Sequence, residues 1–193
     1  MVEPSDGRKA SYGLVNVEPG TERFADTYRV LAAELASGVA VVAARHRNRD
    51  HAVTVTGWLD VSWDPPTLAV SLFEEARICE AVEASGSWTL SVLNSEQQGL
   101  ATWLASPGNP VEGLLTNVAY QRLSDQDRPG EQGPIVISDS LAWFHVETRA
   151  IHAAATHRIV VGEVTSMGRG VHASHADFAR PLIHWARDFH ELA

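Results

Sequence analysis

The sequence lacks the features that mark several broad classes of protein. Its single cysteine, Cys79, excludes an intrachain disulfide and the zinc sites that depend on paired cysteines. Basic residues are scarce: 15 stand against 24 acidic ones, and the net charge is −9. This balance argues against a nucleic-acid surface and against binding to anionic membranes. We therefore expect neither a nucleic-acid partner nor a membrane partner.

Long apolar segments are missing as well. No apolar run reaches the ~18 residues that a membrane-spanning helix needs. The first residues, MVEPSDGRKASYG, are polar and contain no apolar stretch of the kind found in signal peptides. We therefore predict a cytoplasmic protein. A length of 193 residues with 45% hydrophobic content predicts one globular domain, or at most two small ones.

Common nucleotide-binding and catalytic motifs are also absent. The chain contains no G-x-G-x-x-G after a strand, no Walker loop and no G-x-S-x-G elbow. Among nine histidines the only close pair is His172 and His175, in a segment where Asp177 is the one acidic neighbour. We interpret this segment as a solvated loop with incidental histidines, and we predict no metal site.

The patterning of the remaining chain predicts a mainly β protein. Residues 1–20 are polar and rich in glycine and proline, which indicates a flexible arm before a domain at 21–193. A helix capped by Thr21 is expected to end at Ser37-Gly38, and two short helices are expected at 75–85 and from Ser95 to 104. Strands are predicted at 39–44, 52–61, 67–73, 88–93, 141–150, 158–166 and 181–185. The polar segment 106–134 is interpreted as a functional or partner-bound loop. Because the strands lie close together in sequence, an antiparallel barrel is favoured over a βαβ sheet.

Four segments in a fixed order carry a family resemblance: Gly38-Val39 with the valine-rich strand, Val53 to Asp64-Pro65-Pro66, Ser91 to Asn94, and His157 to Val164. Together they resemble the flavin reductase-like family with an FMN-binding split barrel, the reductase components of two-component flavin-dependent monooxygenases. The resemblance runs from about residue 24 to residue 192. It implies a split β-barrel of six or seven mostly antiparallel strands with short inserted helices, assembled as a homodimer.

The resemblance also implies a flavin site along the segment from His51 to Pro66. Hydroxyls at Thr54 and Thr56, a glycine that lets a flat ring approach, and Trp58 as a wall would suit an isoalloxazine ring. The alternative interpretation of this segment is an ordinary half-buried strand. The complete set of expected cofactor-binding residues is Thr54, Thr56, Gly57, Trp58, Asp60, Ser62, Ser71, Arg77 and His157. No catalytic residue is assigned, because hydride transfer needs no protein acid or base at the reacting carbon.

Four parts of the chain depart from the family pattern. Relatives read Ser-Ser-Phe at positions 56–58, where this chain reads Thr-Gly-Trp. Their phosphate-binding loop is rich in serine and threonine, whereas this chain places Arg77 there, whose guanidinium can bind a phosphate through two hydrogen bonds. Relatives read Gly-Asp-His before the strand that begins at Arg158, and here only His157 is kept. Near the end of the chain, Arg187 stands where relatives have glycine.

The function implied by the resemblance is an NAD(P)H-dependent flavin reductase that supplies reduced flavin to a partner monooxygenase. The sequence leaves FMN or FAD, and NADH or NADPH, as open alternatives. A second hypothesis is a non-catalytic carrier or sensor that binds flavin or haem, motivated by the altered phosphate loop and by the altered Gly-Asp-His segment before Arg158. A third is a flavin enzyme that acts on an organic substrate bound near residues 106–134.

Overall fold

The computed structural model describes residues 17–110, 112–124, 132–170 and 180–192. Most of the predicted N-terminal arm falls on residues 1–16, and His172 and His175 fall on residues 171–179. Both predictions therefore lie outside the described residues. The chain divides into two compact units, Met1–Leu35 and Ala36–Ala193. The domain boundary predicted after residue 20 stays a prediction.

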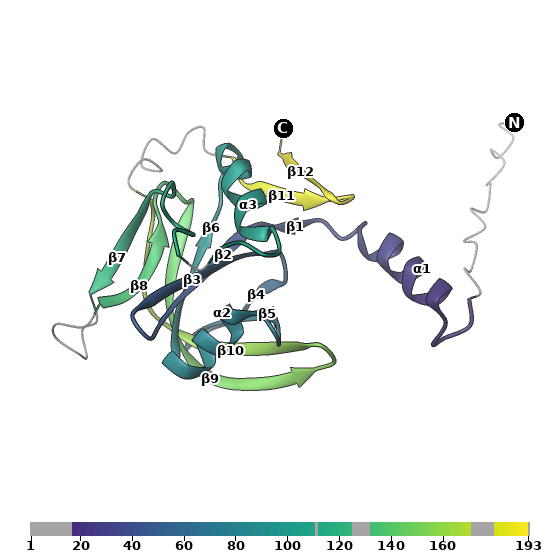
Figure 1. Ribbon diagram of the computed structural model, residues 1–193, viewed down its shortest axis with the longest axis horizontal. Helices are drawn as coiled ribbons and strands as arrows, with labels where there is room; N and C mark the ends of the chain where they lie inside the picture. Colours follow the sequence, from purple (N-terminus) through teal and green to yellow (C-terminus); the bar gives the residue numbers. More distant parts are fainter. Residues whose placement is uncertain (1–16, 111, 125–131, 171–179, 193) are drawn as a thin grey trace, which may run out of the picture. The chain divides into compact units, whose positions relative to one another are not determined.

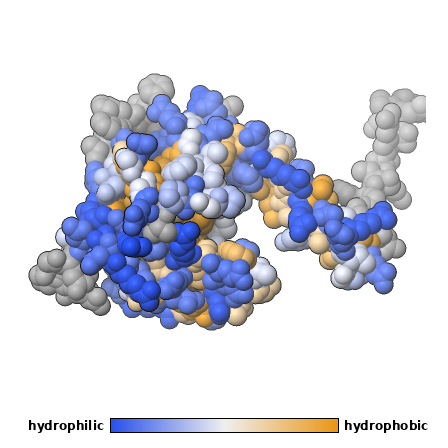
Figure 2. All heavy atoms as spheres, viewed as in Figure 1, coloured by the Kyte–Doolittle hydropathy of each residue, from blue (hydrophilic) through white to orange (hydrophobic). Residues whose placement is uncertain are grey.

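The first unit contains helix α1 (Glu22–Ala32) (Figure 1). Its start was predicted correctly, because the Thr21 hydroxyl accepts a hydrogen bond from the backbone N–H of Phe24 at 3.1 Å. Its predicted end was wrong, since Ser37–Gly38 form the short strand β1 and pair instead with strand β11 (Leu182–Trp185). No residue of α1 is buried, and hydrophilic and hydrophobic residues are both exposed along it (Figure 2).

The second unit is built on a seven-stranded sheet in which every pair of neighbouring strands is antiparallel (Figure 1). The strand order is β3-β2-β6-β9-β10-β5-β4. The strands are β2 (Ala40–His46), β3 (Arg49–Val55), β4 (Trp58–Trp63), β5 (Pro66–Phe73), β6 (Ser87–Val92), β9 (Ala142–Ala154) and β10 (His157–Gly168). The prediction of a mainly β, antiparallel protein is confirmed.

The strand predicted over residues 52–61 is in fact two strands. β3 ends at Val55 and β4 begins at Trp58, so the predicted alternation is interrupted near Gly57. The interruption lets β3 pair with β2 on one side, while β4 pairs with β5. The expected break after β4 is present but shorter than predicted: Asp64 and Pro65 separate the strands, while Pro66 is the first residue of β5 and pairs with Trp63. A proline is tolerated at the first position of a strand.

Smaller elements complete the second unit. They are α2 (Arg77–Ser85), η1 (Ser95–Gln97), α3 (Gln98–Ala105), β7 (Tyr120–Ser124), β8 (Gln132–Ile137), β11 (Leu182–Trp185) and β12 (Asp188–Glu191). The loop prediction for 106–134 was wrong at its end, where β7 pairs with β8. The helix cap predicted at Ser95 is supplied by Asn94 instead. The Asn94 side chain accepts a hydrogen bond from the backbone N–H of Glu96, and Asn94 forms a capping box with Gln97.

Strand β2 is buried on both faces, which explains its continuous apolar run. Alternate residues from Ala40 pack with Trp88 and with α2, and those from Val39 pack with Leu93 and with α3. The two helices therefore cover opposite faces of β2, and β3 forms the edge of the sheet beside it. In the part of the chain that the structure describes, no helix is long and apolar enough to cross a membrane.

Candidate functional site

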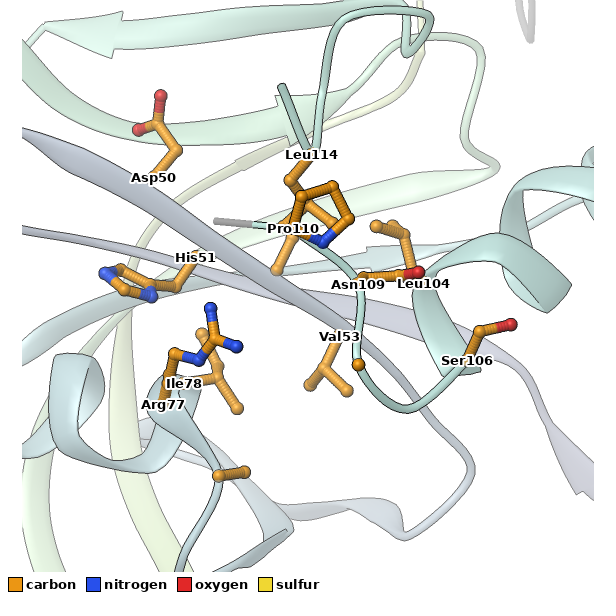
Figure 3. A pocket seen from close by; sticks show the side chains of 13 residues that line it. Asp50, His51, Val53, Arg77, Ile78, Leu104, Ser106, Asn109, Pro110 and Leu114 are labelled. Carbon is orange, nitrogen blue, oxygen red and sulfur yellow. The ribbon is translucent and has the colours of Figure 1, made fainter. Parts of the chain in front are cut away.

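A pocket opens at the β3 edge of the sheet, between α2 and the segment after α3 (Figure 3). Its volume is about 170 Å³. Its polar lining includes Asp50, His51, Arg77, Ser106 and Asn109. Its apolar lining includes Val53, Ile78, Leu104, Pro110 and Leu114. Because Ile78 and Leu104 belong to the cores on opposite faces of β2, the pocket lies where the two cores meet at the edge of the sheet.

Arg77 is the pocket's unpaired cation. It is the first residue of α2, and its guanidinium lies next to the imidazole of His51 (Figure 3). The arginines of the nearby β2–β3 hairpin are paired, Arg45 with Asp50 and Arg47 with a glutamate of α2. Within the described residues Arg77 has no carboxylate partner. Its charge is therefore available to an anionic ligand.

The start of α2 offers hydrogen-bond donors to the same pocket. The N-cap residue is Ala76, which has no side-chain oxygen to accept from the first-turn N–H groups. Ala76 itself lines the pocket. Uncapped N–H groups at a helix start, together with the helix dipole, favour a phosphate or carboxylate.

His51 adds a group that can change its charge. Burial lowers the pKa of His51, and the positive charges of His46 and Arg77 lower it further. Glu80 and Asp50 act in the opposite direction, but the pKa remains below its usual range. The imidazole is therefore mainly neutral at neutral pH when no anion is near. A bound phosphate would favour its protonated form.

Asp50 holds two arginines together beside the pocket. Its carboxylate accepts from Arg45 at 3.0 Å and from both terminal nitrogens of Arg122, at 2.9 and 2.6 Å. Burial by itself raises the pKa of Asp50, but hydrogen bonds and charge from the two arginines outweigh burial and hold the pKa below its usual range. Since Arg122 lies on β7, the cluster ties β7 to the β2–β3 hairpin.

The predicted ring-binding residues at the junction of β3 and β4 have structural contacts of their own. The Thr54 hydroxyl donates to the carbonyl of Ala101 on α3 at 2.8 Å. The N–H of Ser71 donates to the carbonyl of Gly57 at 2.7 Å. A Cβ atom at Gly57 would lie 3.2 Å from the Ser71 Cβ, so the glycine lets β5 approach closely. Thr56 lies between these contacts in the chain and is half-buried.

His157 lies at the start of β10, opposite Phe73 of β5. The two rings pack edge to face with centroids 5.6 Å apart, and the Thr156 hydroxyl lies 3.0 Å from His157 Nδ1. Ser71 is two residues before Phe73, so the structure brings Gly57, Ser71 and His157 together along β5.

Two departures from the family pattern occur where the backbone is left-handed. Ala155, before His157, has φ +53°, and Arg187, in the β11–β12 turn, has φ +68°. The family resemblance implies glycine at these two positions, and glycine adopts this conformation without strain. The chain thus keeps the turn geometry with residues that adopt it at a cost of about 1–2 kcal/mol each.

The remaining predicted residues lie in a second groove. Trp58, Asp60 and Ser62 line a largely apolar groove of about 360 Å³ on β4, together with Trp63 and Met167. The Trp58 indole donates to the carbonyl of Gly38 at 3.0 Å. The predicted set is therefore divided among the Arg77 pocket, the Gly57–Ser71–His157 row and this groove, while Thr54 and Thr56 lie at the end of β3 and line neither pocket nor groove.

From the sequence, His51 was placed at the start of the flavin segment but was assigned no role, and Asn109 and Leu114 were not named as site residues. A histidine in an alternating strand gives no distinctive signal, and contact between α2 and the segment after α3 is a tertiary property. The signal in the sequence that pointed to Asn109 and Leu114 was the interpretation of residues 106–134 as a functional loop. Ser106, Asn109 and Leu114 of that segment line the pocket.

Comparisons with known proteins agree with this architecture. The family model of the flavin reductase like domain matches residues 32–193. The reductase component of 4-hydroxyphenylacetate 3-monooxygenase from Thermus thermophilus is 28% identical over 167 residues, covering 86% of this chain and 96% of that protein. An NADH-dependent FMN reductase from Streptomyces nodosus subsp. asukaensis is 29% identical over 169 residues, covering 86% and 83%.

A solved structure extends the agreement to three dimensions. The flavin reductase component of a bacterial two-component tryptophan halogenase matches with a TM-score of 0.73 and 25% identity, covering 87% of this chain and 98% of that one. This confirms the predicted split-barrel fold. The homologues are named as reductases that work with NADH or NADPH and with FMN or FAD. Because the family match spans most of the sequence, the chain belongs to the flavin reductase-like domain family.

Proposed function

We propose that the protein is an NAD(P)H-dependent flavin reductase. The observation that carries the proposal is the unpaired Arg77 at the uncapped start of α2, which faces a pocket beside β3. Arg77 and the N–H groups at the start of α2 both attract anions, and the walls next to them are apolar. This combination fits a ligand that has a phosphate and a flat ring. The relatives are reductases, which favours this function over a non-catalytic flavin or haem carrier.

The chain's residues would position the reactants and supply no nucleophile. When bound, a flavin would supply a ring that can take up a hydride from the nicotinamide, with one further proton from water to balance the two-electron reduction. Arg77 and the N–H groups of α2 would hold the flavin phosphate. The polar edge between Thr54 and Gly57, with Ser71, would hold the ring. His157 would contact the nicotinamide side, where Phe73 fixes its ring.

Flavin-dependent oxidation of NADH or NADPH tests this proposal. We expect the purified protein to oxidise one of the two nicotinamides rapidly when FMN or FAD is added, and slowly without flavin. The measurement is the loss of nicotinamide absorbance over time, for each of NADH and NADPH combined with each of FMN and FAD. If none of the four combinations showed flavin-dependent oxidation, the proposal would be contradicted.

A homodimer is proposed through strand β4. In the described part of the chain β4 pairs only with β5, so its other edge is open. Exposed apolar side chains lie along β4, with Leu59 55% and Val61 49% exposed. Trp63 is 87% exposed and lies on the side of Asp60, to which its indole donates at 2.7 Å. An open edge with an apolar face favours pairing with another chain. A second copy is the proposed occupant, because the same edge on both copies would form a symmetric interface.

The substitution Leu59→Glu tests this interface. We expect the wild-type protein to be a dimer and the variant to be largely monomeric, because the interface would bury an unpaired carboxylate. Sedimentation velocity gives the mass of each. Leu192→Glu, at a similarly exposed leucine, is the control and should stay dimeric. A monomeric wild type, or a dimeric Leu59→Glu protein, would rule out this interface.

A partner monooxygenase is the proposed consumer of the reduced flavin. Relatives named as reductase components of monooxygenases support it. The cytoplasmic location stays a prediction.

A further inference from the structure

The Arg77 pocket has two chemically different sides. His51 and Arg77 lie together at one side, and Pro110 and Leu114 lie across from them (Figure 3). Its volume of about 170 Å³ is smaller than the ~300–1,000 Å³ of a pocket that encloses a whole drug-sized ligand. The pocket is therefore suited to one part of a larger ligand.

The direction of β3 indicates which part this is, given the proposed function. The proposed ring edge begins at Thr54, and the pocket is lined by residues 50–53 of the same strand. At ~3.3 Å per residue, His51 lies about 10 Å along the strand from Thr54. A flavin whose ring rests at Thr54 to Gly57 would extend its phosphate end toward His51 and Arg77.

The two common flavins differ beyond the first phosphate. FMN ends there, and the side of the pocket formed by Pro110 and Leu114 would stay unfilled. FAD continues with a second phosphate and an adenosine, whose flat base has apolar faces and a polar edge. Apolar walls at Leu104, Pro110 and Leu114 suit those faces.

Asn109 offers a group for the polar edge of adenine. Its amide nitrogen donates to the carbonyl of Trp103, which fixes the side chain at the pocket wall. The amide oxygen is then left as an acceptor, and the exocyclic amino group of adenine is a donor. The pocket thus combines cations for phosphates, apolar walls for a base and an acceptor for its edge.

We infer that this pocket binds the pyrophosphate and adenosine of FAD, with His51 and Arg77 on the phosphates and Leu114, Pro110 and Asn109 around the adenine. The protein accordingly selects FAD over FMN. His51 takes up a proton as the phosphates arrive, since their charge opposes the effects of burial, His46 and Arg77.

Equilibrium binding of riboflavin, FMN and FAD to the full chain tests the inference. We expect FAD to bind at least about tenfold more tightly than FMN. Leu114→Ala should weaken FAD severalfold and leave FMN unchanged. Leu115→Ala is the matched control, because Leu115 packs on the same core but does not line the pocket. Adenosine, which has no phosphate, should compete with FAD and not with FMN.

Three outcomes would overturn the inference. They are equal or tighter binding of FMN, equal weakening of both flavins by Leu114→Ala, and failure of adenosine to compete with FAD. A protein that reduces FMN without preferring FAD would keep the proposed function and lose this inference. A protein that binds no flavin would lose both. Pro110→Ala provides a second variant at an exposed position if Leu114→Ala does not fold.

Discussion

Replacement of Arg77 by alanine is expected to weaken binding of phosphorylated flavins by about 10–100-fold, the loss of a charge-assisted hydrogen bond worth roughly 1.5–3 kcal/mol. The effect should appear in the KM for FMN and FAD. It should be small for riboflavin, which has no phosphate. Because Arg77 is exposed and has no carboxylate partner in the described residues, the stability of the fold should be nearly unchanged.

Arg47→Ala is the matched control for this substitution. Arg47 is exposed, lies on the turn between β2 and β3, and pairs with Glu80 at 3.8 Å, but it does not line the pocket. Arg47→Ala removes the same charge close to α2. The KM values for FMN and FAD should stay within about twofold of the wild-type values, because an exposed ion pair contributes little. Equal losses in the two variants would mean that Arg77 acts through net charge alone. No loss with Arg77→Ala would place the phosphate elsewhere.

Replacement of Asp50 by asparagine is expected to lower the free energy of unfolding by about 2–4 kcal/mol. Asp50 is 16% exposed, and its carboxylate neutralises both Arg45 and Arg122. Removing one partner from a largely buried charge cluster leaves the remaining charges uncompensated. Urea unfolding at neutral pH measures the difference. The outer pair Arg149–Glu147 provides the control, and Glu147→Gln should cost less than about 1 kcal/mol.

The contribution of Asp50 should also depend on pH. Its pKa is lower in the folded protein than in the unfolded chain, so the stabilisation is complete above the unfolded value of ~3.9. It is lost as the pH falls through the lowered folded value. The difference in stability between wild type and Asp50→Asn should therefore be constant from neutral pH to about 5 and shrink in stronger acid. A difference that disappeared near neutral pH would contradict this assignment.

Most of the strands were predictable because the burial of each strand face determines where apolar residues recur in the sequence. Strand β2 is apolar from Ala40 to Ala44 because cores lie on both of its faces, and the turn at Asp64-Pro65 ends β4 before β5 begins at Pro66. The break at Gly57 was missed because alternation continues across it, although the two halves pair with different strands. The pairing of β7 with β8 was missed for a similar reason, since their separating segment is polar and long.

The candidate site was only partly predictable. Arg77 was found because it stands where relatives have hydroxyls, a difference visible in the sequence. His51 and Leu114 meet at the pocket only after α2 and the segment following α3 pack at the edge of the sheet, and no local pattern reports that contact. The roles predicted for Thr54 and Gly57 remain predictions, while the structure adds the contacts each makes with α3 and β5.

Flavin reduction by the protein can be followed by anaerobic mixing of NADH or NADPH with the protein and flavin, through loss of the oxidised flavin's visible absorbance. We predict rapid reduction of FAD by the wild-type protein, and reduction by Arg77→Ala that reaches a comparable rate only at much higher FAD concentration. Flavin that stays oxidised with the wild-type protein would contradict the proposed reductase activity. Equal dependence on FAD concentration in both proteins would contradict the role of Arg77 in holding the phosphate.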